Sequence, residues 1–154
     1  MLLGSNNKEG DLLLKVLVDR LGPATDSFDY IIIDCPPTLD ALAKAVYQFA
    51  DAAIVPVKLD FFSTTGAGQH IGEILEAQEA GIKIEIHTLL PTFTVERQRL
   101  DREMLEVIGQ TYGKAVVGEP IPRSQKVAEA PAYHQTLFEF DPQFESPATL
   151  AYDK

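Results

Sequence analysis

The stretch Phe28-Asp29-Tyr30-Ile31-Ile32-Ile33-Asp34-Cys35-Pro36-Pro37 decides the fold class of this chain. Three β-branched residues run without a polar break into one carboxylate, and two prolines then stop the strand. A continuous apolar run is typical of a strand that is covered on both faces, as in a parallel α/β sheet. We therefore expect a strand over 28–34.

The carboxylate of Asp34 stands at the carboxyl end of that expected strand. Ligands of open α/β sheets bind beyond these strand ends. An acidic residue there, after an apolar run, is the Walker B arrangement, which places a carboxylate to hold a Mg²⁺-bound water beside nucleotide phosphates. A helix cap or a strand-end aspartate without a ligand is the alternative interpretation of Asp34.

The rest of the chain alternates between apolar strands and amphipathic helices. The patterns predict helices over 11–21, 39–50, 64–80 and 95–112, and strands over 52–57, 82–90 and 115–121. Further along, they predict a short helix over 124–130, an extended stretch over 137–140 and a first helical turn over 148–152. Alternating elements imply right-handed βαβ crossovers, so the expected fold is a mostly parallel sheet with flanking helices.

Several residues are expected to end or cap these helices. Gly22-Pro23 should close the first helix, Thr38 should cap the second, and Gly81 should follow the third. The stretch 109–114 has glycines and a lysine but lacks the spacing of a phosphate loop, and it follows a helix. We interpret it as a helix C-terminus that ends on a glycine.

Composition limits the classes of protein. A chain of 154 residues is one domain at most, and a single cysteine, Cys35, excludes an intrachain disulfide and a thiolate metal cluster. We expect that thiol to be buried and inert. There is no signal peptide and no apolar stretch near the roughly 20 residues that span a bilayer, so the expected location is the cytoplasm. The histidines are expected to be ordinary surface or helix residues.

The charge is strongly acidic but unevenly spread. The net charge of −10 argues against a generally nucleic-acid-binding surface. Residues 91–126, however, carry six Lys and Arg against five Asp and Glu, whereas the rest of the chain carries seven against eighteen. This excess predicts either a local basic strip or a solvated helix face laced with salt bridges.

Several segments, in order, resemble motifs of the ParA/Soj/MinD family of deviant-Walker ATPases, which act in plasmid partition and chromosome segregation. Residues 34–39 are similar to the family's DCPPSL, 50–57 to its strand AD-x-x-I-I-P-V, and 61–69 to its YFALEGLSQ. Residues 120–124 and 128–131 resemble its IPR…EAP loop. The resemblance covers nearly the whole chain at family spacing.

The resemblance implies one P-loop NTPase-like, ParA-like ATPase domain over 1–154, incomplete at both ends. It implies Mg²⁺ and ATP as cofactors. The family's phosphate loop, K-G-G-x-G-K-[ST], belongs to an N-terminal strand–loop–helix unit that does not occur in this sequence. Because the lysines of that loop stabilise the transferred charge, we expect this chain alone to hydrolyse ATP negligibly.

The resemblance also implies roles for particular residues. Asp34 would be the catalytic residue and would hold Mg²⁺ through a water, and Pro36 and Pro37 would begin switch II. The implied nucleotide-binding residues are Pro91, Thr92, Phe93, Pro122 and Arg123, and the implied DNA-binding residues are Arg97, Arg123 and Lys126. Simple strand termination and turn chemistry are the alternatives for the prolines.

At the level of function, the resemblance implies a partition or positioning ATPase. ATP would drive a homodimer that binds DNA non-specifically, and a ParB-like activator protein would trigger hydrolysis. We expect no membrane partner, because no amphipathic C-terminal helix is evident. The alternative is a non-catalytic, truncated module that binds a full-length ATPase or a partner protein.

Overall fold

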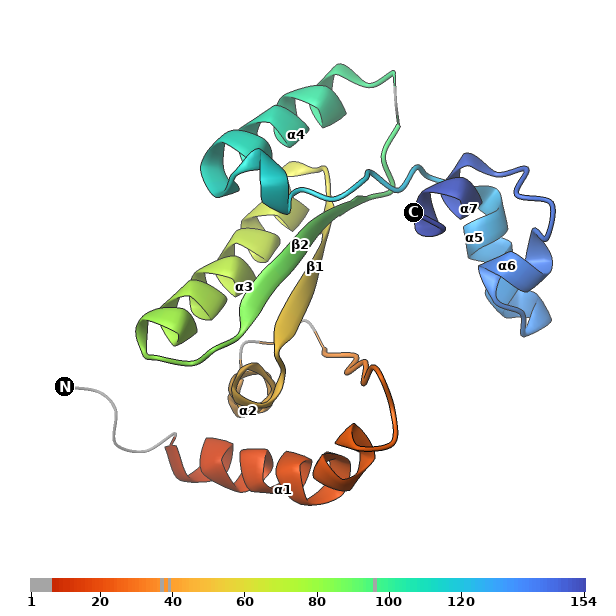
Figure 1. Ribbon diagram of the computed structural model, residues 1–154. Helices are drawn as coiled ribbons and strands as arrows, with labels where there is room; N and C mark the ends of the chain where they lie inside the picture. Colours follow the sequence, from red (N-terminus) through yellow and green to blue (C-terminus); the bar gives the residue numbers. More distant parts are fainter. Residues whose placement is uncertain (1–6, 37, 39, 96) are drawn as a thin grey trace. The chain divides into compact units, whose positions relative to one another are not determined.

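The computed structural model describes residues 7–36, 38, 40–95 and 97–154 (Figure 1). These residues form two compact units, the chain up to 53 together with 70–85, and 54–69 together with 86–154. The first unit holds two N-terminal helices and the stretch that contains Asp34, and the second holds most of the sheet. The expected α/β class, with a parallel sheet and flanking helices, is confirmed.

The first unit is built on α1 (Asn7–Thr25) and α2 (Ala41–Phe49), which pack against each other. α2 begins where the Asp40 carboxylate accepts hydrogen bonds from two amides of the first turn, at 3.0 and 3.2 Å. A carboxylate in this position satisfies amides that have no partner within the helix. Thr38 instead donates its hydroxyl to Asp40, at 2.9 Å. The prediction that Thr38 caps this helix is therefore wrong.

The end of α1 also differs from the prediction. The helix does not close at Gly22-Pro23 but continues to Thr25, with the proline inside it. The Thr25 hydroxyl donates to the Gly22 carbonyl at 2.6 Å, and the Phe28 amide donates to the Ala24 carbonyl at 3.1 Å. These bonds occupy carbonyls of the last turn, so the helix end is stabilised beyond the proline.

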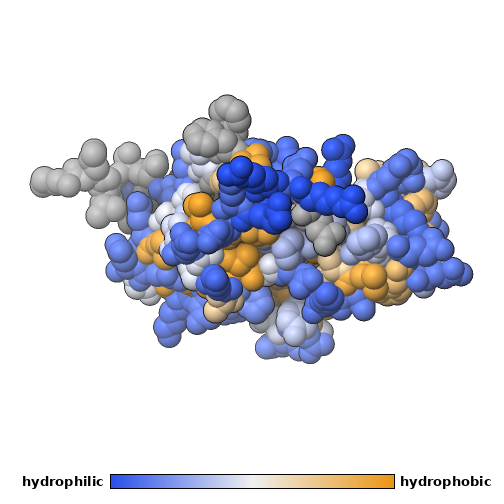
Figure 2. Space-filling view, turned by 90° about the horizontal axis from the view of Figure 1, so that it is seen from above, coloured by the Kyte–Doolittle hydropathy of each residue, from blue (hydrophilic) through white to orange (hydrophobic). Residues whose placement is uncertain are grey.

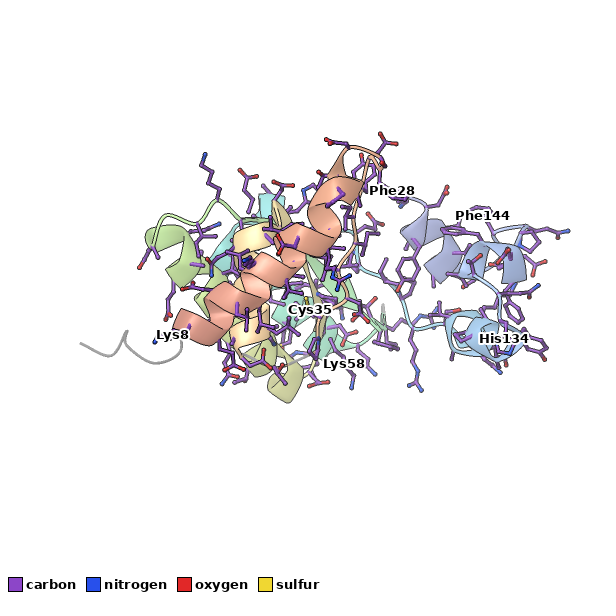
Figure 3. The ribbon with its side chains drawn as sticks, turned by 90° about the horizontal axis from the view of Figure 1, so that it is seen from below. Lys8, Phe28, Cys35, Lys58, His134 and Phe144 are labelled. Carbon is purple, nitrogen blue, oxygen red and sulfur yellow. The ribbon has the colours of Figure 1, made fainter. Side chains whose placement is uncertain are left out.

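Residues 28–36 do not form a strand, so the prediction over 28–34 is wrong. No amide of 29–35 donates a hydrogen bond to another described residue. The side chains nevertheless alternate, because Tyr30 and Ile32 are 87 and 93 % exposed while Ile31 and Ile33 are half-buried. Figure 3 labels Phe28 and Cys35 near the two ends of this segment. A strand needs a neighbour for its backbone groups, and the described part of the chain supplies none.

The second unit contains most of a parallel pair of strands, β1 (Ala52–Lys58) and β2 (Glu85–Thr92), and α3 (Phe61–Glu79) connects the two strands (Figure 1). Both strands bury alternate side chains, with Val57 of β1 and Leu89 of β2 only 2 and 1 % exposed. Parallel strands need such a crossover connection, usually a helix. The two predicted strands and the helix between them are confirmed, with ends shifted by a few residues.

The next helix, α4 (Arg99–Tyr112), begins later than predicted. The carboxylate of Asp101 accepts a hydrogen bond from the Val95 amide at 2.6 Å. Asp101 is buried in the first turn of α4, where a negative charge is favourable beside the unpaired amides. This bond anchors the start of the loop that leads into the helix, so the helical conformation starts only at Arg99.

Two glycines end helices as predicted. Gly81 follows α3 with a φ of 91°, and Gly113 follows α4 with a φ of 94°. Glycine adopts positive φ without the steric cost that a Cβ brings. The interpretation of 109–114 as a helix C-terminus, and not as a phosphate loop, is therefore confirmed.

The strand predicted over 115–121 is reduced to two isolated parallel bridges, Leu89–Val117 and Thr94–Pro122. The stretch starts with a short 3-10 helix, η1 (Lys114–Val116), which takes its first residues out of the extended conformation. Gly118 then comes very close to β2, since its amide donates to the Leu89 carbonyl at 2.9 Å. The segment thus follows β2 without forming a continuous ladder.

The C-terminal part consists of four short helices, α5 (Gln125–Glu129), η2 (Ala130–Tyr133), α6 (Leu137–Phe140) and α7 (Pro147–Tyr152). The short helix predicted over 124–130 and the C-terminal turn are confirmed as α5 and α7. The prediction of an extended stretch over 137–140 is wrong. There Thr136 and Glu139 form a capping box, in which each side chain accepts from the other residue's amide, and this starts α6.

Candidate functional site

The carboxyl end of β2 is joined to the loop around Pro122 by three backbone hydrogen bonds. The Ile121 amide donates to the Pro91 carbonyl at 2.8 Å, and the Thr94 amide donates to the Ile121 carbonyl at 3.1 Å. The Arg123 amide donates back to the Thr94 carbonyl at 2.9 Å. The structure therefore brings together the two segments that carry the predicted nucleotide-binding residues: Pro91, Thr92 and Phe93 in one, and Pro122 and Arg123 in the other.

Phe93 is the unusual residue of this junction. Its φ is 56°, in the left-handed region that residues with a Cβ rarely adopt, and its side chain is 59 % exposed. Residues close to it in the sequence are held in place. Pro91 is fully buried, and Thr94 is buried with its backbone amide and carbonyl both hydrogen-bonded. A strained backbone held by its surroundings is found most often at binding and catalytic sites. The result is an aromatic ring presented to solvent on a firmly held turn.

Asp34 lies near the end of the unpaired segment, with an exposed side chain. Its carboxylate makes no hydrogen bond or ion pair with any described residue. A free, hydrated carboxylate fits Mg²⁺, which keeps several waters and takes one or two protein carboxylates beside substrate phosphates. Pro36 follows, and its carbonyl accepts from the Thr38 amide at 2.8 Å. Pro37 lies outside the described residues.

Cys35 is exposed, so the expectation of a buried thiol is wrong. No described strand pairs with the segment that carries it. Partial burial of the thiol, and then the nearby Asp34 carboxylate, raise the pKa of Cys35. Both effects disfavour the thiolate, which is the reactive form.

The three predicted DNA-binding residues have different surroundings. Arg97 and Arg123 are exposed and make no ion pair with any described residue. Lys126 instead donates to the carboxylates of Asp141 and Glu145, at 2.6 and 2.8 Å. These two hydrogen bonds raise the pKa of Lys126. The cluster has one positive and two negative charges, so Lys126 is the least suited of the three to hold a phosphate.

Asp141 is the centre of a polar network that the sequence analysis missed. Its side chain is buried, and it accepts from the Lys126 ammonium, from the Thr149 hydroxyl at 2.6 Å and from the Ser146 amide at 2.9 Å. Lys126 and then Thr149 hold the pKa of the Asp141 carboxyl well below its usual range. Since these partners belong to α5, α7 and the turn between α6 and α7, the network ties the C-terminal helices together.

His70 lies 3.4 Å from the Tyr47 hydroxyl, measured from Nδ1 to Oη. Within the ranges that the structure describes, no three His, Cys, Asp or Glu side chains are arranged to hold a metal ion. No helix among the described residues is long and apolar enough to cross a membrane.

Comparison with known families identifies the chain. A family model described as "AAA domain" matches residues 3–88, more than half of the sequence. The chain belongs to this family. The ParA/Soj resemblance is confirmed as well, since the chromosome partitioning protein ParA of Caulobacter vibrioides is 29% identical over 119 residues, which is 77% of this chain and 45% of the relative. The chain spans about half the length of the curated relatives it matches.

Solved structures agree on the fold. The apo McdA structure from Cyanthece has a TM-score of 0.75 at 20% identity, over 92% of this chain and 58% of that one. The cobyrinic acid a,c-diamide synthase of Mycobacterium smegmatis, solved with bound ADP and magnesium, has a TM-score of 0.67 at 26% identity, over 91% of this chain and 50% of that one. This AAA-family chain therefore has the P-loop NTPase-like α/β fold expected from its motifs.

Proposed function

We propose that this chain is a nucleotide-binding part of a ParA-type partition or positioning ATPase that uses Mg²⁺ and ATP. The observation that carries the proposal is the backbone junction between the end of β2 and residues 121–123. It gathers Pro91, Thr92, Phe93, Pro122 and Arg123 on one side of the sheet's carboxyl end, where ligands of open α/β sheets bind. The similar synthase solved with ADP and magnesium supports the choice of nucleotide.

Each residue has a role that follows from its surroundings. The exposed ring of Phe93 offers a face on which the adenine base stacks, an interaction worth about 1–3 kcal/mol per base. Thr92 directly precedes Phe93, and Pro122 lies in the segment that is joined to it. Their backbone carbonyls are the proposed acceptors for the amino group of the base. The role of Asp34 comes from the family motif: it would hold a Mg²⁺-bound water, and the ion would supply positive charge for the phosphates.

Equilibrium binding of ATP and ADP, with Mg²⁺, to the purified chain tests this proposal. We expect saturable binding in calorimetry that weakens about tenfold in Phe93→Ala and when magnesium is chelated. Phe138→Ala is the matched control, because Phe138 is also an exposed aromatic residue but lies on α6. Absence of binding at millimolar nucleotide, or equal loss in both variants, contradicts the proposal.

The family also implies ATP-dependent dimerisation and non-specific DNA binding in the cytoplasm, with a ParB-like activator as partner. Arg97 and Arg123 are the proposed phosphate contacts, because both are exposed and unpaired among the described residues. Each phosphate contact adds about 0.9 to the slope of log affinity against log salt concentration. We expect Arg123→Ala to lower that slope by about this amount in DNA-binding titrations, while Lys44→Ala on α2 leaves it unchanged.

A second candidate is the non-catalytic module that binds another protein. The observation that favours it is the unpaired segment 28–36, whose backbone groups have no partner among the described residues. A backbone of this kind is a template for pairing with another chain. This candidate predicts that the chain binds no nucleotide but binds stably to a full-length ParA-type ATPase.

A further inference from the structure

The backbone that follows Phe93 is held from two sides. On one side, Thr94 exchanges backbone hydrogen bonds with the loop at 121–123. On the other side, the Val95 amide donates to the Asp101 carboxylate of α4 at 2.6 Å. Because β2 holds the residues before Phe93, a rotation of its backbone away from the φ of 56° would shift residues 94 and 95 against both attachments. These contacts therefore fix the conformation of Phe93.

Asp101 makes its contact with a buried charge. The residue is only 7 % exposed, and it forms no ion pair with any described residue. Burying a charge costs free energy that its surroundings must offset. The first turn of a helix favours a negative charge, and a bond from an amide to a carboxylate is stronger than one to a neutral acceptor. The bond to the Val95 amide is therefore a strong one.

The usual capping of a helix does not account for this bond. α4 has Gln98 as its N-cap residue, whose side chain makes no capping bond, so Asp101 is the third residue of the helix. An acidic residue in that position ordinarily accepts from the amide of the N-cap residue. Here the Gln98 amide donates to the Val95 carbonyl at 2.8 Å, and Asp101 accepts from Val95, three residues before the N-cap. The carboxylate thus connects α4 to the turn after β2.

The side chain that this turn presents is the exposed ring of Phe93. On the face of the molecule that Figure 2 shows, hydrophobic patches interrupt a mainly hydrophilic surface. A bulky residue keeps a left-handed backbone only when its surroundings hold it there. A ligand that needs this conformation binds more weakly when only a fraction of the molecules adopts it, in proportion to that fraction. Contacts that hold the turn therefore raise the affinity for such a ligand.

We propose that Asp101 is a positioning residue of the nucleotide site, which holds the Val95 amide and so keeps the ring of Phe93 in place for the adenine base. This role rests on the proposed function, since it belongs to the same site. Asp101 does not touch the nucleotide but acts through Val95 and Phe93. Asp101→Asn keeps an oxygen that can accept from the Val95 amide, whereas Asp101→Ala keeps none.

Amide hydrogen exchange without nucleotide tests the contact itself. We expect the Val95 amide to be protected in the parent chain, to exchange at least about tenfold faster in Asp101→Ala, and to keep most of its protection in Asp101→Asn. Glu103→Ala is the matched control, because Glu103 is an exposed acidic residue of the same helix. An unprotected Val95 amide in the parent chain overturns the proposal even if Asp101→Ala does not fold. Unchanged exchange in a folded Asp101→Ala overturns it as well.

Calorimetric titration with ATP and Mg²⁺ tests the positioning, on variants that circular dichroism shows to be folded. We expect Asp101→Ala to weaken ATP binding about fivefold and Asp101→Asn less than about twofold. In a Phe93→Ala background, Asp101→Ala should weaken binding little further, because the ring that it positions is absent. A purely structural role would weaken both backgrounds equally, and that result overturns the proposal.

The same titrations separate this proposal from the proposed function. Absence of ATP binding in the parent chain overturns the proposed function and this role of Asp101 with it. Binding in the parent chain that Asp101→Ala leaves unchanged overturns the role of Asp101 alone.

Discussion

Segment 28–34 and strand β1 have similar sequences and different structures. Each has a short apolar run that ends near a polar or charged residue, and each resembles a strand of the same family. β1 pairs with β2 and buries Val55 and Val57. Segment 28–34 pairs with no described residue and leaves the side chains of Tyr30 and Ile32 almost fully exposed.

The difference shows that a strand is a property of a pair of segments. Apolar β-branched residues favour the extended conformation, but the ladder forms only where a second backbone lies alongside. For β1 that second backbone is within the chain, since α3 returns it to the sheet as β2. For 28–34 no described residue supplies it.

Removing a buried side chain from the paired strands should cost far more than removing an exposed one from the unpaired segment. Leu89→Ala should lower the free energy of unfolding by about 2–5 kcal/mol, because it leaves a cavity beside β1 and the 117–118 stretch. Ile32→Ala should change the free energy by no more than about 0.5 kcal/mol. Urea denaturation measures both, and similar losses would mean that 28–34 is packed like β1.

The C-terminal helices should depend on a single buried carboxylate. Asp141→Asn should lower the urea midpoint clearly, because the side chain loses its charge and keeps only one oxygen, so that either Lys126 or Thr149 is left without its acceptor on residue 141. Glu145→Gln is the control, since Glu145 is exposed and its contact with Lys126 is the weaker of the two. An equal effect of both substitutions would argue against a central role for Asp141.

The same carboxylate predicts a pH dependence. The pKa of Asp141 is lower in the folded chain than in the unfolded one, so the unfolded state binds the proton more readily. The stabilisation is therefore complete above the unfolded pKa of about 4 and is lost as the pH falls through the lower, folded value. Acid titrations of stability should be less steep in Asp141→Asn than in the parent chain, and identical slopes would contradict this assignment.

The close approach of residue 118 to β2 should be sensitive to one methyl group. A Cβ at Gly118 would lie 2.6 Å from the Thr88 hydroxyl oxygen, so we expect Gly118→Ala to cost about 1–3 kcal/mol. Gly72 on α3 has open space, and Gly72→Ala should stabilise the chain by about 0.5–1 kcal/mol. Thermal unfolding of the two variants gives the sign of each effect, and a stabilising Gly118→Ala would show that the bridge to β2 is loose.

The smallest predicted effect is chemical. Since the Asp34 carboxylate contributes to the raised pKa of Cys35, Asp34→Asn should lower that pKa and increase the thiolate fraction. Alkylation of Cys35 by iodoacetamide at pH 8 should become about two- to threefold faster, as expected for one charge in a largely hydrated setting. Asp26→Asn, at the end of α1, is the control and should leave the alkylation rate unchanged. An unchanged rate in Asp34→Asn would show that the Asp34 carboxylate does not contribute to the pKa of Cys35.

Local signals in the sequence predicted most helices and the paired strands. The apolar faces of α2, α3 and α4, and the glycines after α3 and α4, depend on neighbours within a few residues. The start of α6 was missed, since an extended stretch was predicted there, although Thr136 and Glu139 have the spacing of a capping box. The unpaired state of 28–34 could not be predicted from local sequence, since it depends on which backbone lies beside the segment.

The candidate site was predictable only through its motifs. Nothing in the spacing of Pro91 and Pro122 indicates that three backbone bonds join their segments, but the ordered family motifs imply that both residues contact the nucleotide. The Asp141 network was missed because its partner Lys126 is 15 residues away and its Thr149 hydroxyl eight. Pairings across such distances come from tertiary packing and leave no periodic signal.

Amide hydrogen exchange on the dilute chain tests the central claim most directly, namely that 28–34 is a strand sequence without a hydrogen-bonded partner among the described residues. The account predicts that the amides of 29–35 exchange as fast as in an unstructured peptide, while those of β1 and β2 are protected. Protection of 29–35 equal to that of β2 at high dilution would contradict the account.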